Sequence, residues 1–212
     1  MTEARRWGGT TLEDRAAARR AALVEAGTEL LGTVGAEGVT VRAACREAKL
    51  SERYFYESFD GRDALLRAVH GAVAAQARDA IADVVAAHAA GGGDPDDEGL
   101  AHAAVAAFTA FLEEDPRRGR VLLGESFSDT VLARHDVELV PAFAALLVAQ
   151  ITALPDAPDA TDAELTAVAL IGALRTLYLA WLAGDPPVPT ERLNRHAAGL
   201  IIAAARVSSR PS

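Results

Sequence analysis

The spacing of apolar positions predicts helices through most of this 212-residue chain. Apolar residues recur every three to four positions, and no alternating run of Val, Ile or Thr indicates a strand. With caps and helix breakers as boundaries, the pattern predicts an all-α fold of about nine helices over residues 11–34, 41–48, 52–58, 62–90, 100–114, 115–124, 125–154, 161–183 and 190–207.

Capping residues and one proline fix several of these boundaries. Thr11–Asp14 is a capping box that opens the first helix, and Thr161–Glu164 is another for the eighth. We expect Asp60 to cap the fourth helix and Thr190 to cap the ninth. Pro141 should kink or split the seventh, because a proline removes one backbone hydrogen bond.

Residues 40–59 have the spacing of a helix-turn-helix unit. Thr40 and Ser51 are good N-caps for two short helices, and only Lys49 and Leu50 lie between those helices. Small apolar residues along this stretch let the helices cross closely. In such a unit the second helix enters the major groove of DNA.

The outer face of that second helix suits DNA. At about 100° per residue, Phe55 and Phe59 point into the core, and Arg53 lies on the opposite face with Tyr54 and Tyr56 at its flanks. Arginine pairs bidentately with a guanine edge, and tyrosine hydroxyls bind phosphates. The alternative is a solvated helix in which Arg53 and Glu57 form an ordinary ion pair.

Several separated motifs here resemble the TetR family of bacterial transcriptional regulators. They are ELLGTVGAEGVT, the Thr-Val-Arg start of the second helix, Leu-Ser at the turn, Tyr-Phe-Tyr-x-x-Phe, and Phe-Asp-Gly-Arg-Asp-Ala-Leu. The resemblance in order and spacing extends over about residues 13–69. The resemblance implies a DNA-binding domain at residues 1–65, with an N-terminal arm, and an effector-binding and dimerisation domain at residues 66–212.

The same resemblance assigns roles to individual side chains. Phosphate contacts fall to Thr40, Tyr56 and Arg62, and base contacts to Arg42, Arg53 and Tyr54; the cap residue Ser51 completes the DNA-binding set. One departure is Glu52 followed by the bulky Arg53, where many members of the family carry Lys and then Gly. Depth of insertion into the groove depends on that difference.

Charge is distributed unevenly along the chain. The net charge is −9, but residues 1–62 carry ten Lys and Arg against ten Asp and Glu, so the remainder carries the whole excess. A neutral domain binds DNA if its arginines gather on one surface, and the acidic remainder orients it by repulsion. Arg5 and Arg6 lie in an N-terminal arm that either reaches the minor groove or is a disordered tail.

The last two helices predict a homodimer. The eighth is apolar nearly all round, which indicates burial on two sides, and a partner subunit is the simple explanation. The resemblance likewise implies a four-helix dimer bundle. Expected interface residues are Gly172, Leu193, Ala197, Leu200, Ile201 and Ala204.

Aromatic residues of the second domain are candidates for a pocket that binds an unknown small-molecule effector. Core packing is the alternative for each of them, and an ion pair with Glu125 or Asp129 is the alternative for the arginine. We expect His102 and His135 at the surface. The candidate pocket set is Phe108, Phe111, Phe127, Phe143, Arg175, Tyr178 and Trp181.

Other classes of protein are disfavoured. No stretch is expected to span a membrane, no signal peptide precedes the first helix, and the single Cys45 fits a reducing cytoplasm. No cofactor or metal motif occurs, and Gly124–Ser128 lacks the second glycine and the strand of a nucleophile elbow. The sequence therefore predicts a regulator that binds double-stranded DNA rather than an enzyme, and the family resemblance implies that it is a repressor. The alternative is a helical small-molecule-binding or protein-interaction module that does not bind DNA.

Overall fold

Helices form almost all of the computed structural model, which describes residues 11–92, 98–152 and 158–208. No strand occurs among these residues, so the all-α prediction is confirmed. Nine α-helices and three short helical turns follow one another as α1 (Leu12–Val34), η1 (Ala36–Gly38), α2 (Val41–Glu47), α3 (Glu52–Ser58), α4 (Arg62–Ala90), α5 (Glu98–Glu114), α6 (Pro116–Gly119), η2 (Arg120–Gly124), η3 (Glu125–Phe127), α7 (Thr130–Ile151), α8 (Ala160–Leu182) and α9 (Thr190–Ser208).

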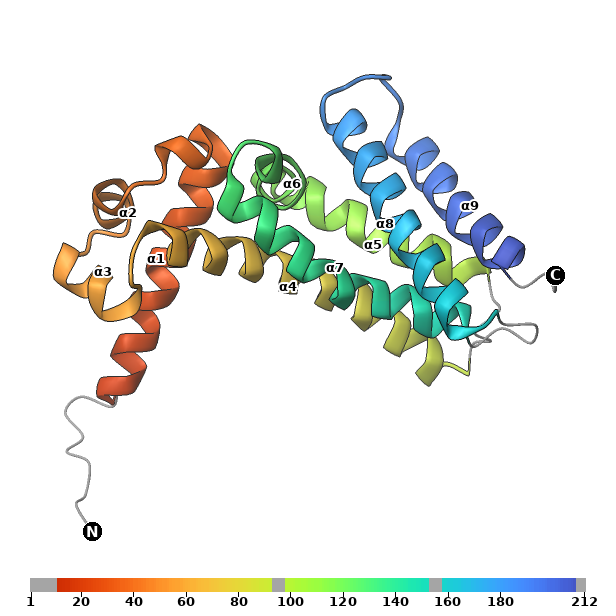
Figure 1. Cartoon of the computed structure of the whole chain (residues 1–212), viewed down its shortest axis with the longest axis horizontal. Coiled ribbons are helices and arrows are strands. Elements are labelled where there is room, and N and C mark those ends of the chain that lie inside the picture. Colours follow the sequence, from red (N-terminus) through yellow and green to blue (C-terminus); the bar gives the residue numbers. More distant parts are fainter. Residues whose placement is uncertain (1–10, 93–97, 153–157, 209–212) are drawn as a thin grey trace, which may run out of the picture.

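The first three helices form a head at one end of the molecule (Figure 1). The long α4 starts beside this head and runs beneath α7 into a bundle made with α5, α8 and α9. Phe55 and Phe59 of the head are buried, as predicted from their spacing. They belong to one continuous apolar core that also contains Leu66 of α4 and Leu132 of α7. The head is therefore packed directly on the elements that reach the bundle.

Two of the predicted caps are confirmed by hydrogen bonds. Thr11 and Asp14 form the reciprocal capping box of α1, and the Thr40 hydroxyl accepts the Ala43 N–H at 3.1 Å. Ser51 is the N-cap of α3 by position, although its side chain makes no capping hydrogen bond. Val34, the last residue of α1, is largely exposed.

Three other boundaries differ from prediction. Gly61, not Asp60, is the N-cap of α4, so this helix start has no capping hydrogen bond from a side chain. The cap of α8 is Asp159, whose carboxylate accepts the Asp162 N–H at 2.9 Å, because the helix starts two residues earlier than the predicted Thr161 box allows. α9 begins at Thr190 itself, and its hydroxyl donates to Glu113.

Residues 115–129 form a more irregular connection than predicted. α6 is only one turn, η2 is a π-helical turn and η3 is a 3₁₀ turn, before α7 begins after its cap Asp129. Pro141 lies inside α7, which continues past it as one helix. The wide η2 turn matters because π-helical turns expose backbone carbonyls to side chains.

Helix α8 corrects one sequence expectation. By length and composition alone it is apolar enough to cross a membrane, and only 17% of its most apolar window is buried within the chain. It packs here against α7 and α9 and carries Arg175 in an ion pair. An open apolar face on a packed helix equally suits a partner subunit, which is taken up below.

Some expectations fall outside the described residues. They concern the N-terminal arm with Arg5 and Arg6, most of the loop of residues 91–99, part of the connection after α7, and the end of the chain. The side chain of Phe127 is outside them as well.

Candidate DNA-binding surface and effector cavity

The outer face of α3 is open to solvent. The Arg53 side chain is 85% exposed, and Tyr56 and Tyr54 are 58% and 39% exposed. Phe55 lies on the opposite side with none of its surface exposed. Large exposed aromatic residues are unusual on a solvated helix, and this arrangement suits contact with a nucleic acid.

Each arginine on this surface already has a carboxylate neighbour. Arg53 Nε lies 3.2 Å from Glu57 Oε1, and Arg42 Nε lies 3.5 Å from Glu52 Oε1. Arg19 of α1 approaches the other oxygen of Glu57 at 3.5 Å and also covers the Tyr54 ring. Such exposed pairs are weak, so DNA can replace them at small cost.

The start of α2 lies beside this face. Arg42 is 87% exposed, one residue after the cap Thr40, which is also exposed. Ser51 is exposed at the start of α3. The predicted DNA-binding residues of α2 and α3 thus share one accessible side of the head, while Cys45 is buried behind them as expected.

Arg62 has a different environment from the other predicted contacts. Its guanidinium donates to Val39 O at 2.9 Å, to Ala36 O at 2.7 Å and to Asp129 Oδ2 at 3.0 Å. These bonds join the start of α4 to the turn before α2 and to the cap of α7. The geometry therefore favours a positioning role inside the protein over the phosphate contact predicted from the sequence.

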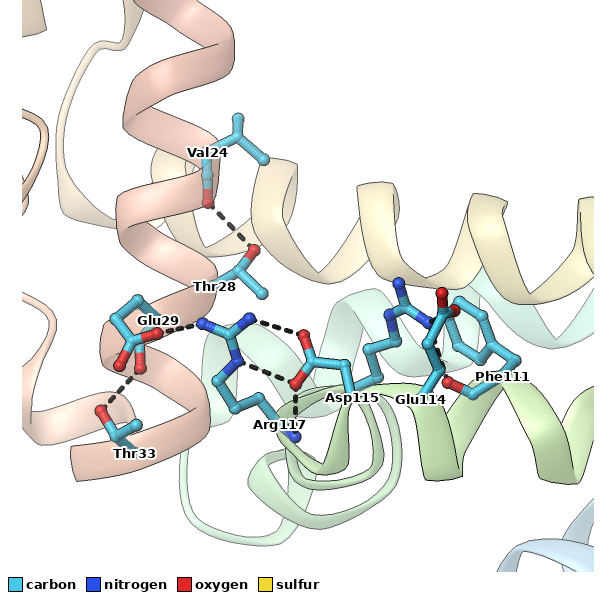
Figure 2. A network of polar contacts seen from close by, with 9 residues as sticks. Val24, Thr28, Glu29, Thr33, Phe111, Glu114, Asp115 and Arg117 are labelled. Carbon is cyan, nitrogen blue, oxygen red and sulfur yellow. Dashed lines mark hydrogen bonds and ion pairs between the residues drawn. The ribbon is translucent and has the colours of Figure 1, made fainter.

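A second polar contact joins the head to α6. Arg117 donates to Glu29 of α1 and, at 2.7 and 2.8 Å, to both carboxylate oxygens of Asp115 (Figure 2). The hydrogen bonds from Arg117 hold the pKa of Asp115 below its usual range. The backbones are close as well, because a Cβ built on Gly32 would lie 2.4 Å from Arg117 Cβ.

The η2 turn makes a third contact with the head. Arg120 donates to Thr33 O at 2.7 Å and to Glu125 at 2.8 Å. The other oxygen of buried Glu125 accepts the Ala36 N–H at 2.8 Å. Between them lies Gly35, whose φ of 80° favours glycine. Head and bundle are therefore joined by directional bonds at the end of α1.

A mainly apolar cavity of about 180 Å³ lies inside the bundle. Of the predicted pocket residues, Phe108, Phe143, Arg175 and Tyr178 line it. Phe111 and Trp181 do not: Phe111 is buried under Arg118, and Trp181 packs edge-to-face behind Tyr178. These two are core residues, which was the alternative considered for each candidate.

Tyr178 is fixed in the cavity wall by its hydroxyl. That group lies 2.7 Å from Thr109 Oγ1, which also bonds Asn194 of α9 at 2.6 Å. Burial raises the pKa of Tyr178 to about 12, so it presents a neutral hydroxyl. Its ring packs edge-to-face on Phe108 at 4.9 Å.

The polar end of the cavity is an ion pair. Arg175 donates to Asp136 of α7 and, at 2.8 Å, to Leu123 O of η2. The predicted partners were wrong: Glu125 pairs with Arg120, and Asp129 pairs with Arg62. The true partner, Asp136, lies on α7, about two helical turns after Asp129, where α7 packs against α8.

Two histidines extend this polar end toward the head. His70 of α4 is fully buried, with Nε2 3.9 Å from Asp136 Oδ1 and Nδ1 3.1 Å from His135 Nδ1. Burial lowers the pKa of His70 in spite of the nearby Asp136, and burial also lowers the pKa of His135. His135 is thus partly buried rather than at the surface, whereas His102 is exposed as expected.

Sequence reasoning missed several of these polar residues. His70, Asp136 and Arg117 were not singled out, although Asp136 interrupts an otherwise helical apolar pattern and was the one available signal. His70 and Arg117 contact residues that are far away in the sequence, and periodicity does not reveal such contacts.

The predicted dimer residues separate into two groups. Leu193 and Ala197 are buried within the chain, where α9 packs on α5, so they are not available to a partner. Gly172 is exposed, and Leu200, Ile201 and Ala204 are partly exposed. An exposed stripe of α8, here called the α8 face, consists of Leu165, Val168, Ala169, Gly172, Ala173 and Thr176.

Comparison with known proteins supports the same class. Residues 23–69 match the family model described as bacterial regulatory proteins, tetR family. No curated protein is detectably similar to the chain in sequence. Solved structures share the fold over almost their whole length.

Three of those structures illustrate the likeness. A putative TetR-family regulator from Rhodococcus sp. has a TM-score of 0.68 at 19% identity, over 92% of this chain and 100% of that one. The fatty acid degradation regulator FadR from Bacillus halodurans has 0.67 at 14%, over 87% and 94%. The multidrug binding protein EbrR, solved with imidazole, has 0.59 at 23%, over 86% and 94%.

The head, with its exposed α3, defines a helix-turn-helix DNA-binding protein. The rest of the chain is a helical bundle of the kind that follows such a head in these solved structures. The head thus matches the tetR-family model of bacterial regulatory proteins over residues 23–69, and the chain shares its fold with solved TetR-family regulators.

Proposed function

We propose that this regulator is a cytoplasmic homodimer that represses transcription at a palindromic operator and is released by a small-molecule effector. The observation that carries the proposal is a polar connection from an exposed recognition helix to an internal cavity. The division at residues 65 and 66 assigns α1 to α3 to DNA and the remainder, with most of α4, to effector and dimer.

The exposed side of the head supplies the DNA contacts. Arg42, Arg53 and Tyr54 read base edges, because they are exposed while Phe55 is buried, and their polar groups suit base edges. The smaller polar groups Thr40, Ser51 and Tyr56 bind phosphates at its rim. In a symmetric dimer the two α3 helices occupy successive major grooves, roughly 34–36 Å apart.

The α8 face supports the dimer. It is apolar, exposed in the single chain and free of ionisable side chains, whereas a solvated helix face normally carries them. Gly172 offers close approach, because nothing in the chain lies within 4 Å of a Cβ built there. Leu200 of α9 borders this face in our proposal.

The effector acts through η2. Leu122 and Leu123 of this turn line the cavity, while Arg120 in the same turn bonds Thr33 O beside the head. A ligand that displaces η2 therefore pulls on the end of α1 and on the start of α4, and it changes the separation of the two heads. The likeness in fold to the multidrug binding protein EbrR supports a small-molecule role for the cavity.

Selection of DNA fragments from the protein's own genome tests the proposal. We expect recovery of a palindromic sequence, retardation of that duplex by the wild-type protein, and dimers in sedimentation at micromolar concentration. Arg53→Ala serves as the matched control, because it removes one exposed side chain and leaves the core intact. Recovery of no preferred sequence would favour the alternative, a helical ligand-binding or protein-interaction module.

A further inference from the structure

The effector cavity continues into a second hollow of about 120 Å³. The two share the apolar residues Ile81, Ala104, Leu146, Leu147 and Ile201 as a common wall. The first hollow alone is slightly larger than a cavity that accepts benzene, at about 150 Å³. The two hollows therefore adjoin each other along a shared apolar wall.

Ionisable side chains line both hollows: Glu98 and Arg206, which form an ion pair, line the second, and another ion pair lines the first. Among the described residues that line the first hollow, Asp136 and Arg175 are the ionisable side chains other than the neutral Tyr178. They pair with each other, and Arg175 also donates to Leu123 O of η2. A ligand that takes either partner therefore acts directly on the turn that contacts the head.

We propose that the effector is a monocarboxylate with an extended apolar body, whose carboxylate replaces Asp136 on Arg175 and whose body lies along the two hollows. This inference deepens the proposed function by naming the chemical class of its effector. Arginine suits the task because its planar guanidinium donates two parallel hydrogen bonds to a carboxylate.

The charges around the ion pair favour an anion over a cation. A cationic ligand on Asp136 would add a second positive charge beside Arg175, which cannot release its proton. An anionic ligand adds a negative charge beside Asp136, and that charge can be neutralised, because His70 Nε2 lies 3.9 Å from Asp136 Oδ1. His70 is hydrogen-bonded in turn to His135.

Binding should therefore bring a proton with it. Burial lowers the pKa of both His70 and His135, so both are neutral before the ligand enters. The charged groups that face them are Asp136 and Glu138 of α7, Arg175 of α8 and Arg67 of α4. Once Asp136 loses Arg175 to the ligand, its carboxylate favours the protonated form of His70.

Titration calorimetry with octanoate, 1-octanol and octylammonium tests the charge preference on the full-length protein. Octanoate should bind about ten-fold or more tightly than either of the others, and its affinity should fall as the pH rises above the free-state pKa of His70, which burial holds below its usual 6.5. Repetition in buffers of different ionisation enthalpy should reveal net proton uptake. Equal or tighter binding of 1-octanol or octylammonium would overturn the inference.

Three variants separate carboxylate binding by Arg175 from a purely structural role of that residue. Arg175→Gln should lose the preference for octanoate and keep its affinity for 1-octanol. Arg118→Gln, whose ion pair with Glu114 lies outside the cavity, should behave as wild type. Asp136→Asn should bind octanoate more tightly and with less proton uptake, a gain that misfolding cannot produce. Weaker octanoate binding by Asp136→Asn would contradict the exchange of partners.

These results are independent of DNA. A protein that binds its operator but prefers octylammonium retains the proposed function and loses this inference. A protein that takes up octanoate with a proton but selects no DNA sequence retains this inference and loses the proposed function.

Discussion

The guanidinium of Arg62 lies 3.0 Å from Asp129 Oδ2, and this contact joins the first residue of α4 to the cap of α7. Arg62 donates at the same time to two backbone carbonyls of the head. Burial alone would raise the pKa of Asp129, but the hydrogen bond from Arg62 and two backbone N–H groups outweigh it, and the net shift is downward. The Asp129 carboxylate thus caps α7 directly and, through Arg62, links α7 to the start of α4 and to the head.

Asp129→Asn should lower the free energy of unfolding by about 1 kcal/mol at neutral pH, after allowance for solvent screening. Asparagine still caps α7, so the loss reports the charge. Because the native pKa lies below the ordinary 3.8, the stabilisation is present above that value and disappears as the pH falls through the native pKa. Urea unfolding of both proteins across pH measures it, and a difference that persisted in strong acid would refute this role. Glu114→Gln is the exposed control.

Arg53→Ala should weaken specific DNA binding by about 1–3 kcal/mol and relax the preference at one base pair in each half-site. Tyr56→Phe is the comparison, because loss of a phosphate contact should weaken specific and non-specific binding alike. Mobility shifts with the selected operator and with point variants of it measure both. An unchanged base preference in Arg53→Ala would show that Arg53 does not contact base edges.

Gly32→Ala should separate α1 from α6. The added methyl group would meet Arg117 Cβ at 2.4 Å and Arg117 Cα at 3.0 Å, so backbone must move. We expect a loss of about 1–3 kcal/mol in unfolding free energy, which is typical of overpacking. Gly124→Ala is the control, since its nearest contact is an ordinary 3.9 Å. Thermal unfolding of the two variants measures the difference, and equal stability would show that α6 moves aside without strain.

Val168→Asp on the α8 face should split the dimer, because a symmetric interface would bury the unpaired charge twice at several kcal/mol each. Each head would then hold one half-site, and tight operator binding should be lost while the helical content is kept. Ala103→Asp, an exposed position of α5, should remain dimeric. Sedimentation separates the outcomes, and a dimeric Val168→Asp would move the interface elsewhere.

The local parts of the fold followed from the sequence. Thr11 and Thr40 cap as their spacing indicated, and Phe55 lies inward because a helical turn dictates it. Contacts between distant segments did not follow. Leu193 has the same apolar character as a dimer contact, and only its packing on α5 assigns it to the core.

Polar partners were the hardest part to predict. The sequence suggested Glu125 or Asp129 as the partner of Arg175, but the crossing of α7 and α8 brings Asp136 to it instead. Arg62 matched a phosphate-binding pattern, yet the fold brings two carbonyls and Asp129 to its guanidinium. Periodicity describes which face a residue occupies, whereas the partner on that face depends on how helices cross.

The glutamates beside Arg42 and Arg53 affect more than a single binding site. A surface that carries its own anions holds fewer loosely bound counterions and displaces fewer from DNA, so its affinity for random sequence is low and varies little with salt. Such a regulator spends little of its time on the rest of the chromosome. Few copies per cell would then be enough to keep one operator occupied.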